Sequence, residues 1–222
     1  DLNPFVFFLD SLNYGQGNPY LQPQFTNNFE ASHTFNKFLT TTLNYTQTDD
    51  IITQMLKQNT EKKVTFQTQE NFNKMKQFGI AVMANFPVTK WWNMNLYTNV
   101  FNNHYTGIYQ DGAKNDAIDI QFTSFMGNMT NSFTIGKKGW TAEVSGWYRS
   151  KAAEGLLIAN EMYAVNSAIS KTILKKKATV KLGVRDIFYT QQFSGYAKYS
   201  DVDVDILSRR DSRQFNLSFN YR

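Results

Sequence analysis

Three aspartates near the end of the chain have the residue type and spacing of a cation site. Asp201, Asp203 and Asp205 alternate with apolar residues, so an extended chain places all three carboxylates on one face. Hard divalent cations prefer such oxygen ligands. The arginine-rich segment 209–213 follows closely and can neutralise the carboxylates instead, which is the favoured interpretation. The sequence therefore predicts no metal and no other cofactor.

Tyrosine rings offer a second kind of chemistry, stacking on the ring of a sugar or a siderophore. Loop packing, or a place at a membrane surface, is the favoured alternative for them. Tyr109 is kept beside the three aspartates as a candidate ligand contact. The tyrosines concerned lie near the ends of longer polar segments and are Tyr105, Tyr109, Tyr163, Tyr189, Tyr196 and Tyr199.

Catalytic chemistry finds little support. His33 and His104 each stand without a second ligand at metal spacing, and the absence of cysteine excludes a thiolate metal site and a disulfide scaffold. Ser, His and Asp form no recognisable nucleophile motif. Glu143 and Glu154 do not make a convincing acid–base pair. The chain is predicted not to be an enzyme.

The elements that carry these residues alternate with a period of two. Trp92, Met94 and Leu96 share one face of an extended segment, while Asn93 and Asn95 share the other. One face is apolar and the other polar throughout, which indicates a barrel wall or a sandwich and not a helix. Together with the pattern of connections described below, it predicts an all-β antiparallel transmembrane barrel. About nine strands are expected, near residues 24–36, 38–52, 64–86, 91–109, 117–135, 140–152, 161–174, 178–190 and 206–222.

The alternation changes phase once. Ile118, Ile120 and Phe122 occupy even positions, whereas Phe125 and Met129 occupy odd ones. A β-bulge adds one residue to a strand and shifts the phase of the residues beyond it. The sequence therefore predicts a bulge near residues 123–124, with a misplaced strand boundary as the alternative that gives the same pattern.

Composition and charge narrow the class of protein. No apolar run approaches the roughly 18 residues of a spanning helix, so a helical membrane protein is excluded. The mean hydropathy of −0.47 does not decide between a soluble protein and a membrane barrel, whose strands mix polar and apolar residues. The net charge is +5, but the basic residues collect at turns, so nucleic acid is not an expected partner.

Short and long connections alternate along the chain. Outer-membrane barrels have short periplasmic turns and long extracellular loops. The expected loops cover residues 47–63, 110–116, 152–161 and 191–205. This parity makes residues 1–23 an extracellular loop and residues 24–222 the strands of one segment. Lysines in the short turns could touch anionic head groups, although ordinary turn chemistry is favoured; they are Lys37, Lys90, Lys137, Lys138, Lys175, Lys176 and Lys177.

One motif resembles a known family. The run Gly17-Asn18-Pro19-Tyr20-Leu21-Gln22-Pro23, followed by a strand with Glu30, resembles a segment of TonB-dependent receptors. Segments 1–5, 89–92, 184–188 and 210–213 look like the receptor-type barrels common in Bacteroides-like bacteria, so the resemblance covers essentially the whole chain.

The resemblance implies the C-terminal part of a barrel of about 22 strands around a plug. The plug, the TonB-binding segment and the first strands would precede Asp1, and a terminal aromatic residue would follow Arg222. The implied function is energised uptake of a siderophore, glycan, peptide or similar nutrient across the bacterial outer membrane. The implied partners are outer-membrane lipid, the protein's own plug, the TonB complex and the barrel assembly machinery.

Two sets of site residues follow from this interpretation. Aromatic residues beside the short turns are expected to form a girdle at the periplasmic lipid interface, with core aromatics of a soluble sandwich as the alternative; they are Phe35, Phe38, Phe86, Trp91, Trp92, Trp140 and Tyr221. Polar residues on the opposite face are expected to line the lumen and are Thr141, Glu143, Ser145, Arg149, Lys181 and Arg185.

Two other functions remain open at this point. One is a small self-contained outer-membrane barrel with a structural or adhesive role. The other is a soluble all-β carbohydrate-binding module, which would present no apolar outer band.

Overall fold

The computed structural model describes residues 2, 5–8, 12–59, 63–111 and 114–221. The described chain is all-β, with a single 3-10 turn, η1 (Leu174–Lys176), and no α-helix. In this part of the chain, no helix is long and apolar enough to cross a membrane.

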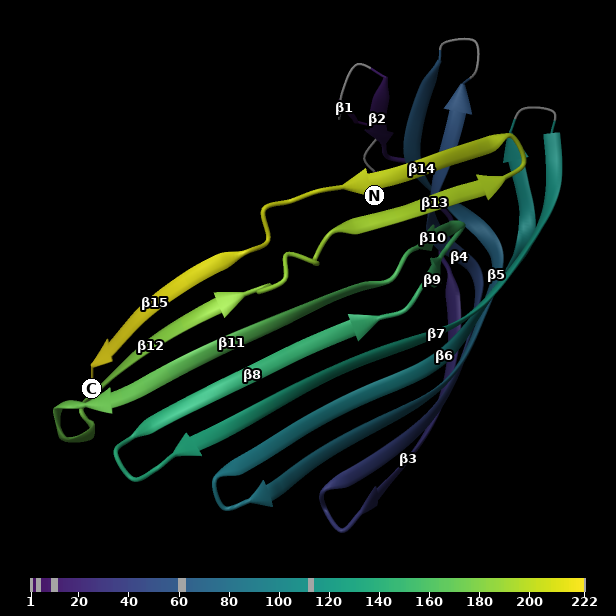
Figure 1. Ribbon diagram of the computed structural model, residues 1–222. Coiled ribbons are helices and arrows are strands. Elements are labelled where there is room, and N and C mark those ends of the chain that lie inside the picture. The colour runs from purple at the N-terminus through teal and green to yellow at the C-terminus, as the bar shows by residue number, and fades with distance from the viewer. Residues whose placement is uncertain (1, 3–4, 9–11, 60–62, 112–113, 222) are drawn as a thin grey trace.

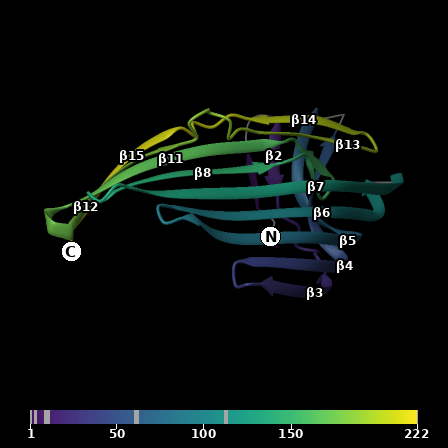
Figure 2. The ribbon, with the colours of Figure 1, turned by 60° about the horizontal axis from the view of Figure 1, so that its bottom comes forward.

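Nine strands of an 11-stranded sheet in the described residues form a curved antiparallel array, here called the wall (Figure 1). Each strand pairs with the next. All the short turns lie at the same end of the strands, here called the short-turn edge. Figure 2 shows the strands side by side. The prediction of about nine strands is confirmed; they are β3 (Phe25–Phe35), β4 (Leu39–Asn59), β5 (Val64–Thr89), β6 (Trp92–Asp111), β7 (Lys114–Ile135), β8 (Trp140–Arg149), β11 (Met162–Ile173), β12 (Ala178–Arg185) and β15 (Gln214–Tyr221).

The wall is open in the described residues. Its first strand, β3, pairs only with β4, and its last strand, β15, pairs only with β12. Every residue of these two edge strands is exposed. Each edge therefore presents a row of backbone N–H and C=O groups available for pairing.

Four further strands form a second sheet, here called the cap. They are β9 (Ala152–Glu154), β10 (Leu157–Ala159), β13 (Phe193–Tyr199) and β14 (Val202–Ser208). Strands β8, β11, β12 and β15 of the wall continue along the chain into β9, β10, β13 and β14, and the cap has the same neighbour order, β9-β10-β13-β14. The cap is therefore an extension of four wall strands beyond a common break (Figure 1).

The cap corrects several expected boundaries. Residues 206–222 are not one strand, because the chain leaves β14 at Ser208 and enters β15 at Gln214. The strand expected at 178–190 ends at Arg185. The expected loops 152–161 and 191–205 contain cap strands, since short apolar runs there find partners in a sheet.

The expected loop 47–63 is mostly strand. Strands β4 and β5 continue as a paired hairpin to Asn59 and Val64, well beyond the point where β6 begins to pair at Lys74. Within residues 1–23, β1 (Val6–Phe8) and β2 (Asn13–Gln16) form a small hairpin, and β2 pairs in parallel with β5. These residues therefore extend the β4–β5 hairpin.

A buried carboxylate fixes the break between wall and cap. Asp186 follows β12, is fully buried, and accepts hydrogen bonds from the backbone N–H groups of Thr190 (2.9 Å) and Gln191 (3.0 Å). It also accepts one from Oγ of Ser212 (2.5 Å), in the segment between β14 and β15. Burial alone would raise the pKa of Asp186, but these hydrogen bonds outweigh it and lower the pKa from its ordinary value. The ionised carboxylate thus connects the segment that follows β12 to the segment between β14 and β15 by hydrogen bonds.

The predicted bulge at residues 123–124 is wrong. The ladder between β6 and β7 runs without a register shift from Trp92 opposite Phe133 to Asp111 opposite Lys114. Phe125 is 37% exposed on one face, whereas Ile118 is 8% exposed on the other face. The part of the wall nearest the short turns, here called the lower wall, is apolar on its outer face. The part beside the cap, here called the upper wall, packs its inner face against the cap, so the apolar residues change faces between the two parts.

This upper packing forms the core of the molecule. Buried side chains of β4–β7 meet those of the cap between the two sheets. They are Met55, Leu56, Phe72, Tyr105, Tyr109 and Ile118 from the wall, and Ala153, Leu156, Ile158, Ala197, Tyr199 and Val202 from the cap and its turns.

Candidate functional site

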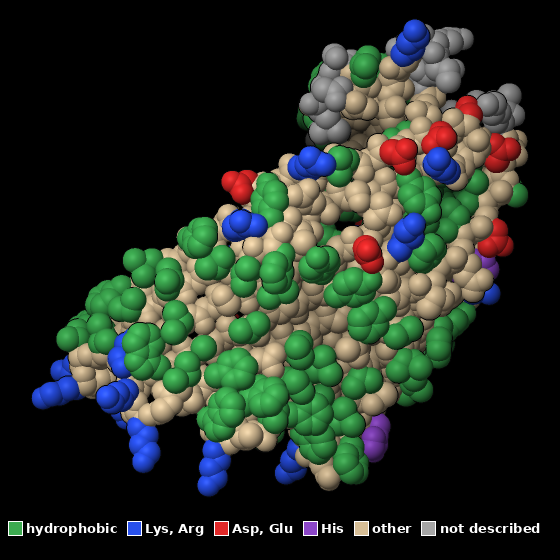
Figure 3. Space-filling view, viewed as in Figure 1, with side chains coloured by type: hydrophobic (Ala, Val, Ile, Leu, Met, Phe, Trp, Pro, Cys, Tyr) green, Lys and Arg blue, Asp and Glu red, His purple; other side chains and the backbone are tan. Residues whose placement is uncertain are grey.

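The two faces of the lower wall differ in chemistry. Residues opposite each other in a ladder share a face, so the register assigns a side to each position. The outer face carries exposed apolar residues in paired rows, among them Leu43, Ile80, Val100, Phe125, Val144, Ile169, Leu182 and Leu217. Figure 3 shows hydrophobic side chains gathered over the lower wall, with Lys and Arg along the short-turn edge. So broad an exposed apolar surface requires a nonpolar surrounding.

The inner face of β4–β7 is polar and uncharged. No Asp, Glu, Lys or Arg occupies an inner-face position in residues 40–48, 75–85, 93–103 and 122–134, all of which the structure describes. Amides and hydroxyls dominate instead, including Thr40, Thr42, Asn44, Thr46, Gln77, Asn85, Asn93, Asn95, Asn99, Asn128, Thr130, Ser132 and Thr134. Such a surface can hold water and neutral solutes without a charged barrier.

These amides are linked across strands. The Nδ2 of Asn44 donates to Oε1 of Gln77 (3.5 Å), and Nε2 of Gln77 donates to Oδ1 of Asn103 (2.8 Å). The Nδ2 of Asn103 then donates to the backbone carbonyl of Ala153 in the cap (3.3 Å). The network runs from the inner face of three wall strands to the cap.

A cavity of about 440 Å³ lies where this network ends, between the upper wall and the cap. Its volume is within the about 300–1,000 Å³ that small-molecule sites occupy. Its lining combines aliphatic side chains, such as Ile52, Leu56 and Ile206, with neutral polar and aromatic ones. The polar and aromatic residues include Gln54, Gln77, Asn103, Tyr105 and Tyr199. Its one charged lining residue is Glu154, whose carboxylate forms an ion pair with Arg149.

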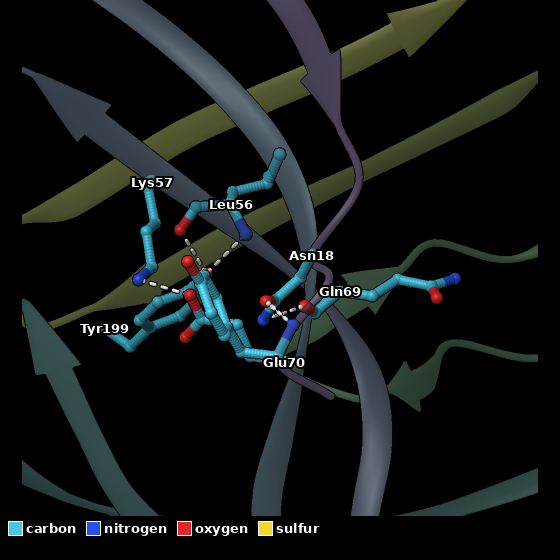
Figure 4. A network of polar contacts seen from close by, with 7 residues as sticks. Asn18, Leu56, Lys57, Gln69, Glu70 and Tyr199 are labelled. Carbon is cyan, nitrogen blue, oxygen red and sulfur yellow. Dashed lines mark hydrogen bonds and ion pairs between the residues drawn. The ribbon is translucent and has the colours of Figure 1, made fainter. Parts of the chain in front are cut away.

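The cap is fixed to the β4–β5 hairpin by Tyr199. Its hydroxyl donates to the carbonyl of Leu56 (2.7 Å) and accepts from the N–H of the same residue (2.9 Å), next to the Lys57–Glu70 ion pair (Figure 4). The ring packs edge-on against Tyr109, with centroids 5.1 Å apart. Burial raises the pKa of Tyr199 to about 12. The phenol therefore stays protonated and keeps both hydrogen bonds.

A glycine permits the close approach of cap and wall. Gly155 has φ +64° in the turn between β9 and β10, and a Cβ there would lie 2.1 Å from Oγ1 of Thr53 in β4. Only glycine gives both this left-handed backbone and this contact.

All six expected lumen residues lie on the inner face. Thr141, Glu143, Ser145 and Arg149 alternate along β8, and Lys181 and Arg185 occupy the same side of β12. The Lys181 ammonium is 4.0 Å from the Glu143 carboxylate. This sector of the inner face is charged, in contrast to β4–β7. Its exposure to a water-filled lumen stays a prediction.

A polar spot lies on this face just below the break. Asn99, Met126 and Arg149 are side by side on β6, β7 and β8. Among the described residues, Oδ1 of Asn99 and the Nε and Nη2 of Arg149 are buried without a hydrogen-bond partner. One acceptor and two donors therefore face the interior at this level.

The candidate ligand contacts are not brought together. Tyr109 is fully buried within β6, and Asp203 lies opposite Lys198, with the charged groups 3.2 Å apart. The cation that pairs with Asp203 is thus Lys198 rather than an arginine of segment 209–213. Asp205 lies opposite Tyr196, and Asp201 lies in the turn. In the described residues, no group of three potential metal ligands occurs.

The expected girdle residues cluster beside the short turns. Phe38 contacts Phe35 and Phe86, with ring centroids 6.1 and 5.2 Å apart. Trp91 and Trp92 contact each other at 6.3 Å, and both contact Phe133, at 6.1 and 6.0 Å. The sequence analysis did not assign Phe133 to the girdle, although the sequence places it on the same strand face as Ile135.

Trp140 and Tyr221 also lie near this edge. The ammonium of Lys171 sits 4.6 Å from the Trp140 ring centroid, and Tyr221 ends β15. That this aromatic row meets a lipid interface stays a prediction.

Residues 1–221 match the sequence model of the outer membrane protein beta-barrel family. The chain belongs to this family. It is accordingly a protein of the bacterial outer membrane.

The fold is also similar to a crystal structure, that of the outer membrane transporter YddB from Escherichia coli. The TM-score is 0.51 at 10% sequence identity, a likeness that shows the fold alone. The match covers 95% of this chain and 34% of that one, so the chain spans about a third of the transporter's length. No curated protein matches the sequence.

Proposed function

We propose that this chain forms part of the barrel of a TonB-dependent outer-membrane receptor that takes up a nutrient. The observation that carries the proposal is the open wall. Strands β3 and β15 both run toward the short-turn edge, so pairing them would give a parallel closure of nine strands. Antiparallel bacterial barrels close with an even number of strands, and the hydrocarbon region does not tolerate unpaired edges. The open wall therefore supports the proposal that additional strands complete the barrel.

The width that results supports transport. A barrel of about 22 strands, the size that the receptor resemblance implies, encloses a lumen wide enough for a plug and a passing solute. The uncharged inner face of β4–β7 and the cavity beside the cap offer hydrogen bonds to that solute. The likeness to an outer membrane transporter agrees with this use of the fold. The proposed substrate classes are siderophores, glycans and peptides. The protein would transport the substrate without changing it chemically.

The mechanism proposed follows the receptor resemblance. Solute binds at the end of the wall where the β4–β5 hairpin extends, opposite the short turns, which is taken as extracellular. There it contacts the cap and a plug. TonB then transmits force from the inner membrane, the plug rearranges, and the solute passes along the polar inner face. The wall also contacts outer-membrane lipid and is inserted by the barrel assembly machinery.

Uptake by the native bacterium tests the proposal. A deletion strain should lose accumulation of one compound from a panel of labelled glycans, peptides and iron chelates. The intact gene should restore it, and depletion of TonB should abolish it again. Accumulation that persists without TonB would overturn the energised mechanism.

A self-contained small barrel with a structural role is the competing function. Intact mass of the protein extracted from its own outer membrane separates the two. A mass several times 25.7 kDa supports the receptor, whereas a mass near 25.7 kDa removes the transport proposal. The soluble carbohydrate-binding module is not retained, because the chain belongs to an outer-membrane family.

A further inference from the structure

All four short turns of the wall between β3 and β12 carry lysine, and none carries an acidic residue. Together these side chains are called the lysine edge. Figure 3 shows Lys and Arg projecting along this edge, while Asp and Glu gather toward the opposite end of the visible face. The lysine edge consists of Lys37, Lys90, Lys137, Lys138, Lys175, Lys176 and Lys177.

These ammonium groups have no ion-pair partner among the described residues. All seven lysines are exposed, and none forms an ion pair with another described residue. The ion pairs of the described residues lie elsewhere, such as Lys57–Glu70 and Lys198–Asp203 near the cap. Seven positive charges along one edge create a positive electrostatic potential that attracts a negatively charged surface.

Turn geometry does not explain the choice of lysine. Lys37, Lys175 and Lys176 have φ of 61°, 55° and 74°, in the left-handed region that favours glycine or asparagine. The turn between β7 and β8 uses Gly136 and Gly139 at such positions. Stability of the turns alone would therefore select glycine at the three lysine positions as well. Leu174, in the same turn as Lys175 and Lys176, has φ of 50° without a charge, so the backbone conformation neither requires nor excludes lysine.

The position of the edge identifies the charged surface. Trp91 and Trp140 lie immediately beside these turns, and Lys171 donates to the carbonyl of Lys138 (2.6 Å) while its ammonium lies over the Trp140 ring. Aromatic belts lie at head-group level, so the adjacent ammonium groups reach phosphate depth. Successive turns are two strand spacings apart, about 10 Å, which gives a continuous charged row along the membrane.

We propose that the lysine edge binds the phosphate groups of anionic phospholipids in the periplasmic leaflet. Each lysine near such a surface strengthens binding roughly fivefold. The proposal rests on the outer-membrane location and on the short turns being periplasmic. It does not require the transport function, and a failure of either proposal leaves the other standing.

Lipid enrichment around the whole protein tests this proposal. The native-length protein is placed in nanodiscs of phosphatidylethanolamine with a minor share of phosphatidylglycerol, and the lipids retained on re-extraction are quantified. Wild type should retain several-fold more phosphatidylglycerol than the disc contains. The variant K175Q/K176Q/K177Q should lose most of this excess. The matched control K74Q/K76Q/K198Q removes the same charge near the opposite end and should keep it.

The remaining arms make each outcome decisive. The variant K175R/K176R/K177R keeps the charge and should retain phosphatidylglycerol like wild type. Inorganic phosphate at millimolar concentration should not compete, because a single free phosphate lacks the row of neighbouring lipids. Equal retention by the glutamine variant and wild type, or equal loss in the control, would overturn the proposal. If the triple variant fails to insert, Lys37→Gln alone is measured and should show a smaller loss.

Discussion

The lower and upper halves of the same strands solve opposite packing problems. Along β7, the lower half turns Phe125 and Met129 outward, where they are 37% and 42% exposed. The upper half turns Ile118 inward, where the cap covers it. Strands β6 and β7 keep one register throughout, so only the residue types change. One strand can thus present apolar residues outward in its lower half and toward the cap in its upper half without a change in its pairing register.

The largest expected difference compares two phenylalanines of β5. Phe72 is 1% exposed in the upper core, and Phe72→Ala should lower the free energy of unfolding by about 3–5 kcal/mol because it leaves a cavity. Phe78 is 52% exposed on the outer face of the lower wall, and Phe78→Ala should cost much less. Guanidinium titration in lipid vesicles measures both. Equal losses would mean that the upper core contributes no more than the outer face.

A charge placed on the outer face should break the lower half. Val144→Arg should impair insertion by about 2–4 kcal/mol near the bilayer midplane. Ser145→Arg puts the same side chain on the inner face, one residue along β8, and should insert normally. Protease protection of protein folded into vesicles reports insertion. If both variants insert equally well, the outer face does not meet lipid.

Two glycines with similar backbones separate conformational strain from crowding. Gly155 and Gly136 have φ of +64° and +61°, but only Gly155 faces a close neighbour, Thr53. Gly155→Ala should cost about 1–3 kcal/mol more than Gly136→Ala, the usual range for overpacking. The double variant Thr53→Ala/Gly155→Ala should recover most of this excess. Failure to recover it would place the damage elsewhere than at the cap–wall contact.

The Tyr199 hydroxyl should give the cap a dependence on alkaline pH. Tyr199→Phe leaves the buried N–H and C=O of Leu56 without their partner and should cost about 1–2 kcal/mol. The folded pKa is about 12 against an ordinary 10.0, so the stabilisation is complete below pH 10 and is lost between pH 10 and about 12. Hydrogen exchange of the cap amides follows this loss. The phenylalanine variant should lack it, and a variant with the same alkaline loss would refute the assignment.

The smallest effect is expected for the exposed pair of the cap. Asp203→Asn removes the ion pair with Lys198 on a surface where such pairs contribute little, so the unfolding midpoint should not change measurably. A clear shift on addition or chelation of calcium in wild type, absent in this variant, would instead indicate a cation site.

The sequence predicted the wall because its alternation is long and regular, as in residues 92–100. It did not predict the cap, because strands of three residues such as β9 and β10 are too short to show a period. The change of phase near Phe122 was visible, but a bulge and an exchange of faces give the same pattern in one strand. Only the pairing with β6 distinguishes them.

The candidate site shows the same division. The side of each lumen residue followed from alternation, as Glu143 and Lys181 illustrate. The partner of Asp203 did not, because the turn between β13 and β14 sets which residue lies opposite, and it selects Lys198. The cavity also escaped prediction, since its walls come from segments far apart in the chain, such as Gln54 and Tyr199.

The contact between Leu56 and Tyr199 has a kinetic consequence. The two residues are separated by 143 positions, whereas wall hairpins such as β7–β8 join neighbours in the chain. Contacts between distant segments form slowly, because the entropy of closing a long loop must be lost first. The cap should therefore dock last, after the strands on both sides have been laid down. A newly inserted molecule would pass through a state with a finished wall and an exposed upper core, the stage at which chaperones of the cell envelope have something to recognise.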